Sequence, residues 1–308
     1  MPGAYAHLTL VNMMTNRLDS IENFPSTAKT AYLDYFSFCE LGAVSPDYPY
    51  LAITDGDATM WADNMHYQDT GEMIKAGTRA VSAMPPGGAK DKSLAWLLGY
   101  AAHVTMDVTI HPIVELKVGT YQGHETEHRV CELHQDAFIF RRLELGVIGL
   151  SEHLDSGLAT CNATGDRDKI DPVIGELWSG MLQEVYPGTF NDNPPDIDLW
   201  HKRFIGIVDK IEDAGRLLLM ARHTAVNAGL VYPADDNIDD QFILNLQTPE
   251  TPMDYDVIFD RALDNVGKVW AWIGRDVAAG TETEIAAIGN WNLDTGRDEQ
   301  GDLVFWEA

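Results

Sequence analysis

The stretch that decides the fold covers residues 91–118, DKSLAWLLGYAAHVTMDVTIHPIVELKV. Its apolar side chains fall on most sides of a helix, and a helix that is apolar all round usually lies at the centre of a protein. His103, Asp107 and His111 follow one another along it at four-residue intervals. This spacing predicts three ionisable side chains on one face of a buried central helix.

These side chains need a reason to lie on an apolar helix, because an unpaired buried charge is costly. A divalent cation supplies one, since imidazole and carboxylate are good zinc ligands and the ion offsets the desolvation of Asp107. The next predicted helix, residues 124–145, repeats the spacing with His128 and Glu132. Two adjacent antiparallel helices can direct both sets to one point, as in metal sites inside helical bundles. A single histidine is more often a hydrogen-bonded core residue, so the repetition is what favours a metal cluster.

The rest of the chain also has helical periodicity, in five further segments. These are residues 4–20, 26–42, 70–84, 198–228 and 255–279. We interpret residues 42–63 as a loop and residues 162–197 as short helices mixed with loops. No segment shows sustained alternation of period two. We therefore expect an all-α, multi-helix bundle with a zinc cluster in its core.

The sequence predicts one domain over residues 1–308. Its metal-site half is residues 1–145, followed by a helical remainder, 146–284, and an extended tail, 285–308. Within the tail, residues 289–297 could border the site, but we interpret them as a surface strap. The three cysteines predict no disulfide framework.

The charge balance limits the partners that we expect. The chain has 48 acidic against 21 basic residues and a formal net charge of −27. Such a surface repels nucleic acid backbones and anionic membranes at long range, although a metal cluster makes a locally positive pocket. No run approaches the roughly 18 apolar residues of a membrane span, and the first residues lack the pattern of a signal peptide. We expect no nucleic acid partner, no integral membrane segment and a cytoplasmic location, or secretion if the sequence is truncated; the oligomeric state stays open.

Four sequence motifs, which follow one another in a fixed order along the chain, are similar to those of a known protein family. They are YAHLTL at 5–10, GAVSPDY at 42–48, WADNMHY at 61–67, and the two helical motifs above. In this order they resemble the zinc-dependent phospholipase C family, most closely the catalytic domain of its glycosylphosphatidylinositol-specific phospholipase D branch. The resemblance spans roughly residues 3–140. The short interval from Asp107 to His111 is similar to that branch, whereas bacterial phospholipases C have a longer one.

The resemblance implies a helical domain that holds two or three zinc ions. The first ion would be held by Asp47, His66, His103 and Asp107, and the second by His111, His128 and Glu132. The third would lie on His7, a bridging Asp107, and the amine and carbonyl of the N-terminal residue, which is Pro2 if Met1 is removed. Family members often have Trp at that position, and this chain does not.

The implied activity is hydrolysis of a phosphoric ester. Water held between zinc ions ionises near neutral pH and attacks phosphorus. Asp47 is a candidate to orient or deprotonate that water in addition to binding metal. Tyr48 matches an aromatic residue of the family's headgroup pocket by position, although it could equally be a packed loop tyrosine. We expect the substrate to be a phospholipid or a small soluble phosphoester.

Three alternatives remain open at this point. A single-strand nuclease of the same fold would need a positive or aromatic groove, and the net charge argues against it. A di-iron oxidase-like enzyme would leave His7, Asp47 and His66 without a role. A metal-stabilised binding protein without activity would have a coordinatively closed site.

Overall fold

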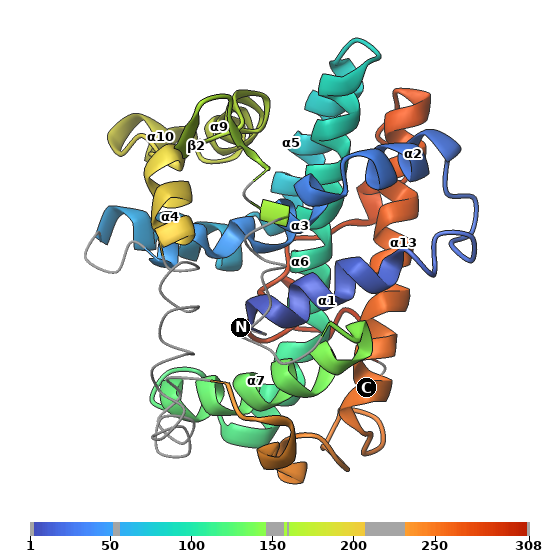
Figure 1. Ribbon diagram of the computed structural model, residues 1–308, viewed down its shortest axis with the longest axis vertical. Helices are drawn as coiled ribbons and strands as arrows, with labels where there is room; N and C mark the ends of the chain where they lie inside the picture. Colours follow the sequence, from blue (N-terminus) through green and yellow to red (C-terminus); the bar gives the residue numbers. More distant parts are fainter. Residues whose placement is uncertain (1–2, 52–55, 146–156, 159, 207–231, 307–308) are drawn as a thin grey trace.

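The computed structural model describes residues 3–51, 56–145, 157–158, 160–206 and 232–306, and this part of the chain is mainly helical (Figure 1). Its α-helices are α1 Ala4–Met14, α2 Ser26–Asp34, α3 Phe36–Val44, α4 Gly56–Tyr67, α5 Thr70–Ala83, α6 Gly88–Val118, α7 Glu125–Phe140, α9 Pro172–Val185, α10 Pro187–Asp192 and α13 Tyr255–Ala279. Residues 197–206 are also helical. The 3₁₀ turns are η1 Ser45–Leu51, η2 Arg141–Leu143, η3 Asp235–Asn237, η4 Asp240–Phe242 and η5 Ile285–Ala287. These elements confirm the expected all-α fold class.

A small hairpin interrupts the helices. Strand β1, Asn162–Ala163, pairs antiparallel with β2, Asp166–Ile170. The turn between them contains Gly165 at φ +81°, in the left-handed region that favours glycine. The sequence did not predict this hairpin, because so short a first strand cannot show the alternation that identifies a strand.

Helix α6 is the centre of the molecule, and its middle turns are buried on all sides. Helix α3 crosses it so closely that a Cβ atom on Gly99 would lie 2.0 Å from the carbonyl oxygen of Cys39, and one on Gly42 would meet the α6 backbone as closely. Helix α13 lies along another side (Figure 1). There Trp270 Nε1 donates a hydrogen bond to the Leu98 carbonyl at 2.8 Å. The predicted central helix is therefore confirmed.

Several predicted element boundaries were wrong. The helix expected over residues 4–20 ends at Met14, and most of the helix expected over residues 198–228 lies outside the described residues. The helix expected over residues 26–42 breaks at Tyr35, whose φ of −123° and ψ of 37° leave the helical region, and no glycine or proline marks this break. Helix α4 occupies part of the stretch that we interpreted as a loop. Its Trp61 is buried against Tyr186 and Trp200, with ring centroids 6.1 and 6.5 Å away. Burial of this ring stabilises α4, a helix that the polar composition of the segment does not predict.

The tail after α13 consists of η5, further turns and isolated bridges, and it packs across the molecule. Trp291 N–H donates to Thr70 Oγ1 at 2.8 Å, which joins the tail to the start of α5. Trp306 Nε1 donates to the Thr109 carbonyl at 2.9 Å, which joins its far end to α6. The predicted organisation as one domain stays a prediction.

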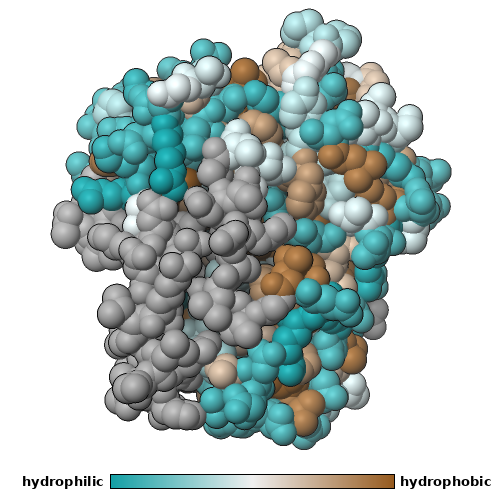
Figure 2. Space-filling model, viewed as in Figure 1, coloured by the Kyte–Doolittle hydropathy of each residue, from teal (hydrophilic) through white to brown (hydrophobic). Residues whose placement is uncertain are grey.

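The face shown in Figure 2 is hydrophilic over most of its described surface, with hydrophobic residues in separate patches. This agrees with the large excess of acidic residues. Within the described residues, no helix combines the length and the apolar character that crossing a membrane requires.

Candidate metal centre

The α6 histidine that begins the motif is fixed by its neighbour α3. His103 is fully buried, and its Nδ1 lies 2.8 Å from the Ala43 carbonyl oxygen. Because a carbonyl only accepts, Nδ1 carries a proton, and Nε2 is the nitrogen that faces the opposite side and can bind a metal ion. The close glycine crossing of α3 and α6 therefore determines which nitrogen faces the site.

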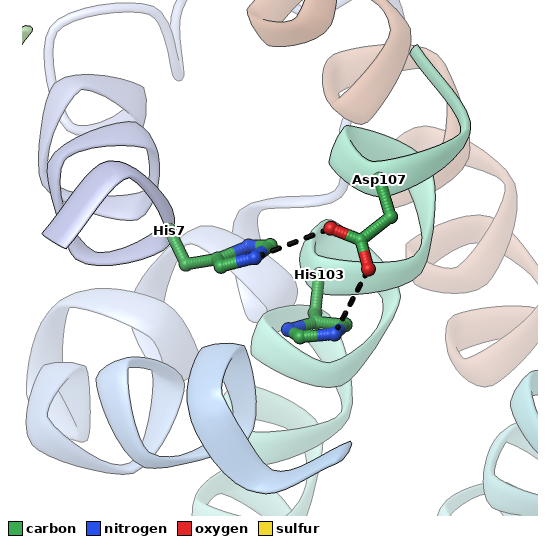
Figure 3. Close-up of side chains that lie close together, drawn as sticks. All are labelled: His7, His103 and Asp107. Carbon is green, nitrogen blue, oxygen red and sulfur yellow. Dashed lines mark ion pairs between the residues drawn. The ribbon is translucent and has the colours of Figure 1, made fainter. Parts of the chain in front are cut away.

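A first group of side chains consists of His7 from α1 with His103 and Asp107 from α6 (Figure 3). Asp107 Oδ1 lies 3.2 Å from His7 Nε2, and Asp107 Oδ2 lies 3.2 Å from His103 Nε2. The two imidazole rings are stacked, with centroids 4.1 Å apart. The carboxylate thus faces a different histidine with each oxygen.

A second group consists of Asp47 from η1, His66 from α4 and again His103. Asp47 Oδ1 lies 3.3 Å from His66 Nε2 and 3.9 Å from His103 Nε2. His66 Nδ1 donates to the Ala62 carbonyl one turn earlier, at 2.7 Å. In both groups the candidate ligand atoms lie within 4.8 Å of one another. Four segments that are distant in the sequence therefore converge on one buried point.

Within the described residues, eight buried atoms of these side chains and of His111 lack a hydrogen bond of good geometry. They are both ring nitrogens of His7, Oδ1 of Asp47, Nε2 of His66, His103 and His111, and both carboxylate oxygens of Asp107. Buried polar atoms without partners are rare in native proteins, and each needs an explanation. Nitrogen and carboxylate oxygen donors are the set that zinc prefers. The residues therefore fit a zinc ion.

The charges agree with this reading. Burial acts to raise the pKa of Asp107, but His103, His111 and His7 hold it well below the ordinary range. Burial acts to lower the pKa of His103, but Asp107 and Asp47 raise it to about 9. Without metal, a proton on His103 therefore balances part of the carboxylate charge. A metal ion would displace that proton, so binding depends on pH.

The remaining predicted ligands lie beside this point but form no equally compact group among the described residues. His111 is buried, and its Nδ1 donates to the Leu293 carbonyl at 2.8 Å. His128 Nε2 donates to the Gly119 carbonyl at 2.7 Å, and its Nδ1 lies 4.0 Å from Glu132 Oε1. Burial raises the pKa of Glu132. Pro2 lies outside the described residues, and the second and third ions stay predictions.

Tyr48 is placed in the core. Its ring is fully buried and stacks on Phe204 at a centroid distance of 4.5 Å, with Trp178 and His201 nearby. This burial favours the packed loop tyrosine over contact with substrate. The role in substrate binding stays a prediction.

Sequence reasoning missed the contribution of the tail. Leu293 contacts His111 through its carbonyl, and Asp294 Oδ1 lies 3.7 Å from His111 Nδ1. The interpretation of residues 289–297 as a surface strap therefore needs correction, because part of this segment borders the site. A backbone carbonyl leaves no signal in the sequence, so only the acidic Asp294 could have pointed to this contact.

Comparison with known proteins agrees with this geometry. The family model described as zinc dependent phospholipase C matches residues 6–188. The matched region is more than half of the chain and includes every candidate ligand from His7 to Glu132. Neither the curated proteins nor the solved structures gave a match. The chain belongs to the zinc-dependent phospholipase C family.

Proposed function

We propose that this protein is a zinc-dependent phosphoric ester hydrolase of phospholipase C type. The observation that carries the proposal is the set of eight buried nitrogen and oxygen atoms that lack a hydrogen bond of good geometry within the described part of the chain. They come from histidines and carboxylates that four separate segments bring together. Membership of the family supports the same reading.

The geometry supports a specific division of ligands. His103 Nε2 has one lone pair and can therefore bind only one ion. We propose that this ion is held by Asp47, His66 and His103 together. Asp107 can serve two ions, because its oxygens face His103 and His7 separately at 3.2 Å. We further propose that His111, His128 and Glu132 hold a second ion and that His7 and the N-terminal residue hold a third.

Zinc ions bound here would lower the pKa of a water molecule and offset negative charge on phosphoryl oxygens. Asp47 is the residue that we propose to act on that water. Its side chain is 18% exposed, whereas those of His66, His103 and Asp107 are fully buried. A carboxylate at the solvent edge of the site can accept a proton from an attacking water molecule.

We propose that the substrate is a phospholipid or a small phosphodiester. The family suggests a lipid. We also propose that this protein is similar to the glycosylphosphatidylinositol-specific phospholipase D branch of the family. This part of the proposal rests on the unbroken helix between Asp107 and His111. The same geometry disfavours a di-iron enzyme, because His7, Asp47 and His66 join the α6 residues. The partial exposure of Asp47 disfavours a closed structural site.

The test combines elemental analysis with hydrolysis of bis-p-nitrophenyl phosphate. We expect two or three zinc ions per chain, and activity that a chelator removes and zinc restores. His103→Ala should abolish activity and remove most of the bound zinc, because it removes a ligand shared by both compact groups. Iron in place of zinc, or no bound metal, would overturn the proposal.

His134→Asn is the matched control. His134 is a buried histidine on α7, and its Nδ1 accepts a hydrogen bond from Asp239 N–H at 3.0 Å. Asparagine keeps an acceptor there. We expect this variant to retain zinc, and equal losses in both variants would argue against the site assignment.

A further inference from the structure

The tail contains a segment, residues 291–297, that joins α4, α5 and α6; we call it the strap. Trp291 exchanges two hydrogen bonds with Thr70, because its N–H donates to Thr70 Oγ1 and its carbonyl accepts from it, both at 2.8 Å. At the other end, Gly296 lies against α6, and a Cβ atom there would be 2.5 Å from the Val108 carbonyl oxygen and 2.4 Å from Pro112 Cγ. The strap lies outside the residues that match the family.

Leu293, in the middle of the strap, connects two candidate ligands. Its N–H donates to the His66 carbonyl at 3.0 Å, and its carbonyl accepts from His111 Nδ1 at 2.8 Å. The second bond keeps the proton of His111 on Nδ1. The lone pair is then on Nε2, which is buried and has no hydrogen-bond partner in the described protein. One backbone residue therefore fixes both the orientation and the tautomer of His111.

Asn292 fixes the backbone of the strap. Its Oδ1 accepts from the N–H groups of Asp294 and Thr295 at 3.1 and 3.0 Å, and from the Thr295 hydroxyl at 3.2 Å. These bonds close a turn directly after Leu293. Asp294 Oδ2 accepts from the Tyr67 hydroxyl at 2.9 Å, so the strap is also held from α4.

We propose that the strap is a positioning element of the metal centre, in which Asn292 holds the Leu293 carbonyl and that carbonyl holds His111 ready for zinc. The proposal rests on the proposed function in one respect, that His111 binds zinc. Hydrogen bonds to the far nitrogen of a ligating histidine set its orientation and basicity, and their loss lowers metal affinity by about 10- to 100-fold.

The experiment compares Asn292→Ala with Asn292→Asp, each measured for Zn²⁺ affinity by competition with a chromophoric chelator. Alanine removes the acceptor that shapes the turn, whereas aspartate keeps it. We expect Asn292→Ala to weaken the most weakly held zinc by about 10-fold or more, and Asn292→Asp to restore it. The visible spectrum of the Co²⁺-loaded protein should change in the same variant only. Gln300→Ala, an exposed change in the same tail, should alter neither quantity.

A second variant changes the strap at its other end, so that the effect on zinc does not depend on Asn292 alone. Gly296→Ala should push the strap from Val108 and Pro112 and weaken zinc in the same way. Unchanged zinc affinity and Co²⁺ spectra in both Asn292→Ala and Gly296→Ala would overturn the proposal. This outcome is distinct from failure of the proposed function, in which the wild-type protein binds zinc but hydrolyses no phosphoester.

Discussion

At the scale of the residue, the central feature is the buried carboxylate of Asp107. Each of its two oxygens lies 3.2 Å from a different imidazole nitrogen, one of His7 and one of His103. A carboxylate in such a place is costly without a cation. The spacing of His103, Asp107 and His111 predicts this shared face, and the structure places all three there.

Asp107→Asn tests whether the carboxylate binds zinc. Asparagine has nearly the same shape but only one oxygen and no charge, so it cannot serve two ions. Zinc at 100 times its dissociation constant stabilises a one-site protein by about 2.7 kcal/mol. We expect the zinc-induced rise in Tm to be clearly smaller in Asp107→Asn, because the ions that contact this residue would bind less tightly. Asp264→Asn, an exposed change 67% accessible in its side chain, should leave the rise intact, and an intact rise in both variants would contradict the assignment.

A second residue makes a prediction about pH. Burial raises the pKa of Asp136 from 3.8 to about 7, against the influence of Arg129. A carboxyl whose pKa is higher in the folded state contributes no penalty below pH 3.8. The folded protein then loses stability as the pH rises from 3.8 to about 7, and the loss is complete above about 7. At about 1.4 kcal/mol per unit of pKa, this loss is at most about 4 kcal/mol.

We therefore expect Asp136→Asn to stabilise the metal-free protein at pH 8 and to change little near pH 4. Asparagine keeps an oxygen that can accept from Ala6 N–H, now bonded to Asp136 Oδ1 at 3.2 Å. Urea unfolding of chelator-treated protein at the two pH values measures the difference. Destabilisation at pH 8 would show that the carboxylate is ionised and favourable there.

At the scale of the element, sequence patterns predict long helices well and short or tail elements poorly. Helix α13 lies at the predicted residues 255–279, and α6 begins only slightly before its predicted start. The break at Tyr35 and helix α4 escape prediction because tertiary packing decides them. The contact of Leu293 with His111 escapes for another reason, since backbone atoms make it and any residue offers them.

The crossing of α3 and α6 makes a prediction about packing. A Cβ atom on Gly99 would meet the Cys39 carbonyl at 2.0 Å, so Gly99→Ala must separate the two backbones. Overpacking of this kind costs about 1–3 kcal/mol. Because the Ala43 carbonyl orients His103 from α3, we expect zinc affinity to fall together with stability.

The matched control for this change is Gly180→Ala in α9, where an added Cβ atom would meet nothing within 4 Å. An exposed helical glycine replaced by alanine stabilises by roughly 0.5–1 kcal/mol. Denaturant unfolding and zinc titration of both variants measure the effects. Equal zinc affinity in the two variants would show that the crossing of α3 and α6 does not affect zinc binding.

At the scale of the whole molecule, the motifs in the first half of the chain predict the family and the kind of site. The family match and the two groups that share His103, one with His7 and Asp107 and one with Asp47 and His66, agree with that prediction. The number of ions and the substrate remain proposals, since they depend on bound groups and on surfaces that the motifs do not describe.

The net charge of −27 makes the last prediction, which concerns the stability of the metal-free protein. Self-repulsion of so many like charges destabilises a compact state. Added salt screens it, because the Debye length falls from about 30 Å at 0.01 M to about 3 Å at 1 M. We therefore expect the Tm of chelator-treated protein to rise steadily with sodium chloride.

Salt also changes the solvent, so a charge variant must separate screening from that effect. Replacing the exposed Asp34, Asp192 and Asp236 together by asparagine lowers the negative charge by three without touching the core. If repulsion is the cause, this variant has a higher Tm at low salt and a shallower rise with added salt than the parent. Parallel curves for the two proteins would mean that the acidic surface does not limit stability and that the gain comes from the solvent.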